Sequence, residues 1–133
     1  EPRIENCLLE KLAINSVINP MTALLNITNG ELDNHRHKTA LDCAITEVAT
    51  IFRWSGQAEI AENLSNRVHH VISDTANNSS SMRIDRQRLS LTEHEEILGY
   101  LLEEFGGTVA QERPSTPLLS NWLTALRQPY PSP

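Results

Sequence analysis

The chain has 133 residues, a hydrophobic share of 39%, an aromatic share of 5% and a formal net charge of -6. This length predicts one compact domain with a buried core, and the low aromatic share favours aliphatic helix packing. The acidic balance argues against a basic surface for nucleic acid or anionic membranes, and no apolar run reaches the ~18–20 residues that span a bilayer.

The first predicted helix runs from Ile4 to Ile18, where apolar residues recur at helical spacing. Because proline lacks the N–H that a helix interior needs, we expect this helix to end or kink at Asn19-Pro20. Lys11, Asn15 and Asn19 lie four residues apart and form a polar stripe on an otherwise apolar helix. The stripe favours a buried helix with one face toward a wet cleft. A second explanation is equally good. The asparagines hydrogen-bond to nearby backbone groups, and the lysine extends its ammonium group into solvent.

The middle of the chain predicts two further long helices. Asn29-Gly30 marks a tight turn, and a polar stretch over 31–38 follows it. The next helix, Thr39–Trp54, is amphipathic and stops at Ser55-Gly56. The third helix is predicted over Ala58–Ala76, with apolar residues on one face.

The two cysteines, Cys7 and Cys43, each lie in an apolar, helix-like run. This pattern predicts buried free thiols in a reducing compartment such as the cytoplasm, rather than a disulfide framework. Neither cysteine has a histidine or a second cysteine at zinc-ligand spacing, so we expect no metal site.

Residues 77–81 are a run of asparagines and serines ahead of a short helix predicted over Met82–Leu89. A helix N-terminus presents free backbone N–H groups and the positive end of the helix dipole, which bind a carboxylate or phosphate. Serine hydroxyls add hydrogen-bond donors. Ordinary N-capping explains the same residues more simply.

Another helix is predicted to open at Thr92, with Glu95 as its capping-box partner, and to close at Gly106-Gly107. Glu93 lies among three glutamates at this helix start, a pattern that by itself indicates dipole stabilisation and solvated charge. Pro117–Leu126 is the last predicted helix. No segment alternates like a strand, so the predicted fold is all-α, a single domain of about six to eight helices.

Several motifs resemble the C-terminal domain of the ketopantoate reductases (2-dehydropantoate 2-reductases), which has a 6-phosphogluconate-dehydrogenase-like fold. Residues 11–24, KLAINSVINPMTAL, are similar to the family's K-L-A-x-N-x-x-I-N-P-L-T-A-L run. Residues 29–32, 75–82, 92–93 and 99–101 resemble, in family order, the motifs N-G-E-L, T-A-x-N-x-S-S-M, T-E and G-Y-L. The chain departs from the family at Leu98, where asparagine is usual, at His94-Glu95, where I-D is usual, and by two extra residues before the serine-rich motif.

The resemblance implies a role for each matching residue. Lys11 matches the catalytic lysine, and Glu93 matches an acidic residue that reaches the active centre near the nicotinamide of the cofactor. The implied substrate-binding residues are Asn15, Asn19, Asn29, Asn78, Ser80 and Ser81. The implied reaction is hydride transfer from NADPH to the ketone of 2-dehydropantoate, which makes (R)-pantoate on the route to pantothenate and coenzyme A. A lysine ammonium suits it, because the nascent alkoxide needs a proton and a positive neighbour.

The resemblance also implies partners. The family's G-x-G-x-x-G fingerprint lies in an N-terminal Rossmann domain, and no such motif occurs in these residues, which begin Glu1-Pro2. We therefore expect residues 1–133 to be the C-terminal domain of a longer protein and to be inactive alone. The expected partners are its Rossmann domain, a small 2-oxo acid and a second copy of the chain. Two alternatives stay open: a non-catalytic helical binding or dimerisation module, and a reductase of another 2-oxo acid.

Overall fold

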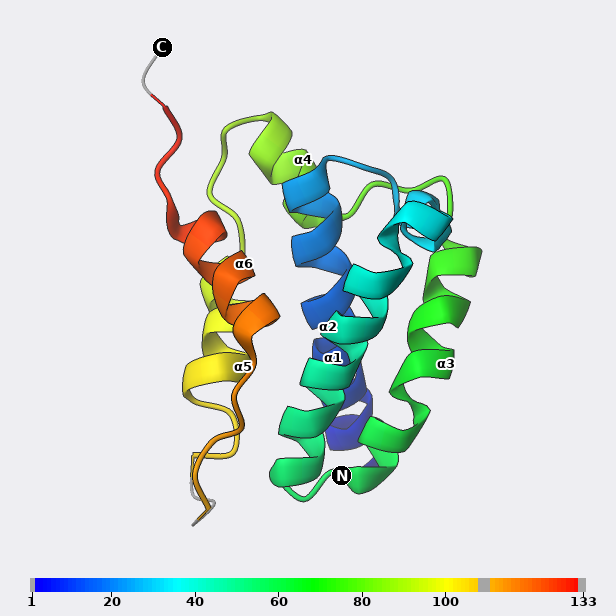
Figure 1. Ribbon diagram of the computed structural model, residues 1–133, viewed down its shortest axis with the longest axis vertical. Helices are drawn as coiled ribbons and strands as arrows, with labels where there is room; N and C mark the ends of the chain where they lie inside the picture. Colours follow the sequence, from blue (N-terminus) through cyan, green and yellow to red (C-terminus); the bar gives the residue numbers. More distant parts are fainter. Residues whose placement is uncertain (1, 108–110, 132–133) are drawn as a thin grey trace.

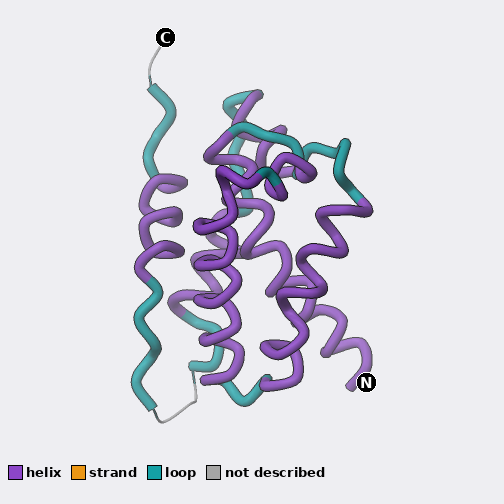
Figure 2. The backbone as a smooth tube through the Cα atoms, turned by 45° about the vertical axis from the view of Figure 1, so that its right-hand side comes forward, coloured by secondary structure: helices purple, strands orange, loops and turns teal. Residues whose placement is uncertain are grey.

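The computed structural model describes residues 2–107 and 111–131, which form helices and loops and no strand (Figure 2). This confirms the all-α prediction. The order is α1 (Pro2–Leu25), the 3₁₀-helices η1 (Asn29–Asp33) and η2 (His35–His37), α2 (Lys38–Trp54), α3 (Ala58–Asp74), α4 (Ser81–Gln87), the π-helix η3 (Glu95–Gly99), α5 (Tyr100–Glu103) and α6 (Pro117–Arg127). Within the described ranges, no helix is both long and apolar enough to cross a membrane.

Helix α1 is the element around which the others pack, with α2, α3, α4 and α6 all in contact with it (Figure 1). Its side chains are buried from Ala13 to Ala23, apart from the half-buried Asn15. A helix that is apolar on nearly all sides satisfies the hydrophobic effect only in such a central position. Polar residues of α1 contact two of these neighbours, since Glu10 pairs with Arg67 of α3 and Thr22 contacts Ser80 at the start of α4.

The sequence predicted that the first helix ends or kinks at Asn19-Pro20. It does not end there, since α1 continues to Leu25. Pro20 cannot donate the helix hydrogen bond to the carbonyl of residue 16. The turn that follows is nevertheless fully packed, since residues 21–23 are at most 4% exposed. Burial of this turn compensates for the missing hydrogen bond, so the tertiary packing overrides the local signal.

Helices α2 and α3 form an antiparallel pair joined by the turn at Gly56, whose φ of +93° favours glycine. The predicted inner face of α2 is confirmed, since its six members are all buried: Leu41, Ala44, Ile45, Val48, Ile51 and Phe52. Helix α3 ends at Asp74, two residues before the predicted end.

The capping box predicted between Thr92 and Glu95 is wrong. The hydroxyl of Thr92 lies 2.6 Å from Nδ1 of His94, and the Glu95 carboxylate binds Arg127 of α6 instead. The helical segment starts one turn later than predicted, as η3, and passes directly into α5. A charged partner from another helix therefore outcompetes the local cap.

The prediction that both cysteines are buried is also wrong, because Cys7 and Cys43 are exposed. Cys43 stands on the outer side of α2, next to the exposed Asp42 and Thr46, while the buried face of that helix points inward. An apolar neighbourhood in sequence does not fix the side of the helix on which a residue lies.

Candidate functional site

Lys11 and Asn15 lie on the side of α1 that faces α3. Lys11 is exposed and Asn15 half-buried. Both line a hollow of about 360 Å³ between the two helices, together with Cys7, Glu10, Ile14, Arg67 and Val71. The Arg67 guanidinium pairs with the Glu10 carboxylate across the hollow. Here an ammonium and an amide share an open depression with an apolar floor, which is the composition of a small polar-ligand site.

Asn29 is held against the loop that follows α3. Its backbone N–H donates to the Asn78 carbonyl at 3.0 Å, and the Gly30 N–H donates to the Ala76 carbonyl at 2.8 Å. Its side-chain Nδ2 donates to Thr75 Oγ1 at 2.9 Å. The fold thus brings together Asn29 and Asn78, two of the residues that the resemblance singled out.

The Asn29-Gly30 pair begins η1 rather than forming an isolated tight turn. A Cβ atom on Gly30 would lie 2.8 Å from both Cβ and the carbonyl oxygen of Ala76, which is closer than atoms can approach. Glycine is therefore required by the close approach of two backbone segments. This approach fixes the position of Asn29.

The side-chain oxygen Oδ1 of Asn29 is buried and has no hydrogen-bond partner among the described residues. Asn29 is only 7% exposed. The orientation of its amide is set by Thr75, whose hydroxyl donates to the Val71 carbonyl at 2.6 Å and so accepts from Asn29 Nδ2. An unpaired buried acceptor is unfavourable. This oxygen has almost no accessible surface, so a donor that satisfies it must fit an enclosed position, as a water or a single hydroxyl group does.

A second buried polar group joins α4 to α1. The hydroxyls of Thr22 and Ser80 are 2.7 Å apart, and Thr22 also donates to the Ile18 carbonyl at 2.8 Å. Ser80 accepts from the Arg83 N–H at 3.1 Å as the N-cap of α4. Asn19, which is 9% exposed, lies one turn before Thr22. The capping interpretation of Ser80 is thus correct, and its hydroxyl is already engaged in the fold.

The remaining predicted residues, Asn78, Ser81 and Glu93, are exposed. Within the described ranges, no side-chain hydrogen bond or ion pair connects Lys11, Ser81 and Glu93 to one another. Their side chains are free to contact a ligand. Sequence reasoning missed Thr22 and Thr75, although both lie inside the family-like motifs, because their partners come from other segments.

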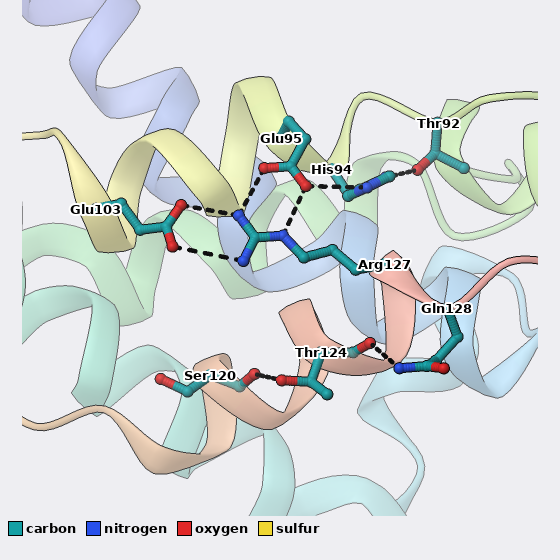
Figure 3. Close-up of polar contacts among 8 residues, drawn as sticks. All are labelled: Thr92, His94, Glu95, Glu103, Ser120, Thr124, Arg127 and Gln128. Carbon is teal, nitrogen blue, oxygen red and sulfur yellow. Dashed lines mark hydrogen bonds and ion pairs between the residues drawn. The ribbon is translucent and has the colours of Figure 1, made fainter.

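In sequence, Glu93 lies between Thr92 and His94, whose side chains contact each other (Figure 3). Beyond the contact of Thr92 with His94, Nε2 of His94 is 3.3 Å from Glu95 Oε2. Arg127 donates to both oxygens of Glu95, at 2.6 and 2.7 Å, and also binds Glu103 at 2.8 Å. The Arg127 guanidinium lowers the pKa of the Glu95 carboxyl, and these carboxylates raise the pKa of Arg127.

In the described parts of the chain, no group of three or more histidine, cysteine, aspartate or glutamate side chains is placed so that it could hold a metal ion. The candidate site residues supply an ammonium, amides, hydroxyls and a carboxylate. Such groups bind and orient a small oxygen-rich molecule and move protons.

The comparisons with a family model and with curated proteins agree on one family. Residues 3–127 match the family model described as "Ketopantoate reductase PanE/ApbA C terminal". The chain is 44% identical over 93 residues to a 2-dehydropantoate 2-reductase of Salmonella typhimurium, and 34% identical over 103 residues to one of Vibrio cholerae. These matches cover 70% and 77% of this chain.

Among solved structures, a probable 2-dehydropantoate 2-reductase from Bacillus subtilis is similar, with a TM-score of 0.71 and 29% identity over 89% of this chain. The match covers 38% of that protein, and the two curated relatives are covered over 30% and 35% of their lengths. The chain thus spans about a third of the length of the proteins it matches.

Proposed function

This chain belongs to the ketopantoate reductase family through its C-terminal domain, and we propose that it is the substrate-binding and proton-donating domain of an NADPH-dependent 2-dehydropantoate 2-reductase. In this proposal residues 1–133 are one domain of a two-domain enzyme and carry out no hydride transfer alone. The relatives bearing that name are the first support. The second is the chemistry of the site.

The buried, unpaired Oδ1 of Asn29 is the observation that carries the proposal. 2-Dehydropantoate has one hydroxyl group, while its ketone and carboxylate oxygens only accept hydrogen bonds. A substrate with a hydroxyl donor satisfies Asn29, and a simple 2-oxo acid without one leaves it unpaired. Because sites built to bind a hydroxyl discriminate strongly against analogues that lack it, this atom favours a hydroxylated 2-oxo acid.

We assign to Lys11 the proton that the new alkoxide receives when the ketone is reduced. Its ammonium is exposed at the hollow that Asn15 also lines, so it can reach a ligand without first breaking an ion pair in the described residues. A positive charge at this place stabilises the developing negative oxygen. Asn15 and Asn19 donate and accept without adding charge, which suits them to orient the substrate.

NADPH, when bound, supplies the hydride. The described residues form no strand, and the sequence contains no G-x-G-x-x-G motif, so this domain does not build a site for the pyrophosphate. We therefore assign dinucleotide binding to a separate Rossmann domain. We assign to the exposed carboxylate of Glu93 the role of orienting the Lys11 ammonium near the nicotinamide once the two domains are joined.

The experiment joins this chain to the nucleotide-binding domain of the Salmonella typhimurium relative and follows NADPH oxidation with 2-dehydropantoate. We expect turnover, and we expect Lys11→Ala to lower kcat roughly 10²- to 10⁴-fold, the range for loss of a general acid. Lys38→Ala is the matched control, since Lys38 is an exposed lysine on α2 whose only ion pair among the described residues is with Asp42. Unchanged turnover in Lys11→Ala would refute the assigned role.

Asn29 separates the alternatives. If the substrate hydroxyl binds Oδ1, Asn29→Ala raises the KM for 2-dehydropantoate and leaves the KM for a 2-oxo acid without a hydroxyl unchanged. If the enzyme instead reduces another 2-oxo acid, the unaltered chain has a lower KM for that acid than for 2-dehydropantoate. Lack of turnover with every 2-oxo acid, in a folded two-domain protein, supports the non-catalytic module instead.

A further inference from the structure

We propose that Arg127 is a positioning residue for Glu93 and acts through Glu95 and His94 (Figure 3). This inference rests on the proposed role of Glu93 at the active centre. Arg127 is the last residue of α6, far from Glu93 in sequence, and no motif of the family-like pattern contains it. The connection between Arg127 and the candidate site is therefore visible only in the three-dimensional structure.

The backbone at Glu93 is anchored on both sides. On one side Thr92, which is 8% exposed, holds Nδ1 of His94 at 2.6 Å. On the other side the Glu93 carbonyl accepts the Ile97 N–H at 3.1 Å, which begins the helical segment. The side chain of Glu93 itself is exposed, so the surrounding contacts fix where it starts and leave its carboxylate free for a ligand.

The imidazole of His94 is the link between these anchors and α6. Its side chain is 12% exposed, and its second nitrogen lies 3.3 Å from Glu95 Oε2. The two ring nitrogens thus contact Thr92 and Glu95 at the same time, and a ring held at both ends cannot rotate freely.

Arg127 holds the outer end of the chain of contacts. It donates from Nε and Nη2 to the two oxygens of Glu95, the bidentate geometry that orients a carboxylate most strongly. Glu103 on α5 accepts from the same guanidinium at 2.8 Å. Arg127 is thereby fixed between two carboxylates, one at the start of η3 and one at the end of α5, and it ties the Glu93 segment to α6.

The first test measures native-state amide hydrogen exchange in this chain, with no need for activity. We expect Arg127→Gln to speed exchange at residues 94–97 roughly three- to tenfold, because the segment opens more often when its anchor is removed. Glu95→Gln removes the same ion pair with a smaller change of shape and should act alike. Lys38→Gln breaks an exposed ion pair on α2 and should leave these amides unchanged.

The second test is a double-mutant cycle in the two-domain enzyme. We expect Arg127→Gln to lower kcat roughly tenfold, with less than a twofold change in the KM for the 2-oxo acid, and to have no further effect when Glu93 is already Gln. A merely structural role of Arg127 lowers kcat by the same factor in both backgrounds, and that result overturns the proposal.

The turnover measurement and the hydrogen-exchange measurement test the proposed function and the positioning role of Arg127 separately. A two-domain enzyme without turnover refutes the proposed function, and the exchange experiment then decides the positioning role alone. Unchanged exchange at residues 94–97 in both Arg127→Gln and Glu95→Gln overturns the proposal. An equal increase over the whole chain does so too, since it signals general destabilisation rather than release of one segment.

Discussion

The carboxylate of Glu47 caps helix α6 by accepting the backbone N–H of Leu119, the third residue of that helix. Glu47 Oε1 accepts the Leu119 N–H at 2.9 Å, and Oε2 accepts the neighbouring Leu118 N–H at 3.1 Å. Glu47 belongs to α2 and is only 9% exposed, while α6 starts with Pro117 at its first position. A side chain from another helix thus does what an N-cap residue normally does from the preceding position.

Loss of this cap should destabilise the domain. We expect Glu47→Ala to lower the free energy of unfolding by about 1–3 kcal/mol, since two buried N–H groups and the helix dipole lose their partner. Glu47→Gln keeps one acceptor and should cost less. Urea denaturation followed by circular dichroism measures both. Glu62→Ala on the exposed side of α3 should stay within about 0.5 kcal/mol of the unaltered chain, and an equal loss there would contradict the capping role.

The Asn29-Gly30 segment should not tolerate a side chain at Gly30. In Gly30→Ala the new Cβ would meet Ala76 at 2.8 Å, and the atoms that it meets include the Ala76 backbone carbonyl oxygen, which cannot rotate away. We expect a loss of about 1–3 kcal/mol in the free energy of unfolding, with weaker binding of 2-dehydropantoate because Asn29 moves away from Thr75. Among the described residues, the new Cβ of Gly107→Ala meets only the Glu104 carbonyl, at 3.1 Å, and this change should be milder. Equal costs at the two glycines would contradict this explanation.

Sequence patterns predicted the helices well where the local signal and the packing agree. The apolar face of α2 and its stop near Gly56 follow from period and glycine placement. The helix continues past Pro20 instead of ending there, because burial of the following turn outweighs one missing hydrogen bond. The exposed Cys43 shows the same limit, since the composition around a residue does not reveal its side of the helix.

The candidate site likewise has features that the sequence predicts and contacts that depend on tertiary packing. Spacing alone placed Lys11 and Asn15 on one face of α1, and both line the same hollow. The contact of Asn29 with Thr75 depends on where α3 ends, and that of Glu95 with Arg127 depends on how α6 packs. Such pairs are distant in sequence and carry no periodic signal, so a single sequence does not predict them.

The Arg127–Glu95 pair should make stability depend on pH in the acid range. The hydrogen bonds from Arg127 lower the pKa of Glu95 below its ordinary value of 4.5 in the folded chain. The pair therefore stabilises the fold fully above that value, and the contribution is lost as pH falls through the lower, folded-state pKa. The stability difference between the unaltered chain and Glu95→Gln should shrink as pH drops below 4.5. Because the Glu95 side chain is 49% exposed, added salt should also reduce this difference.

Urea titrations of both proteins from neutral to acid pH measure this dependence. Glu62→Gln is the control, since Glu62 is exposed on the outer side of α3. The stability difference between Glu62→Gln and the unaltered chain should not change with pH in the same way. A constant difference between the unaltered chain and Glu95→Gln down to the acid limit would show that the ion pair contributes nothing to folding.

The two exposed thiols allow a test of the surroundings of Cys43. Desolvation, followed by the charge of Glu47, raises the pKa of the Cys43 thiol above its ordinary value of 9.0. Since the thiolate is the nucleophile, Cys43 in a Cys7→Ser variant should react slowly with iodoacetamide at neutral pH, and faster only as pH rises past that value. Glu47→Gln removes the charge and should speed the reaction. Cys7 in a Cys43→Ser variant reports on general opening, because a parallel increase there would trace the faster alkylation to unfolding rather than to the lost charge.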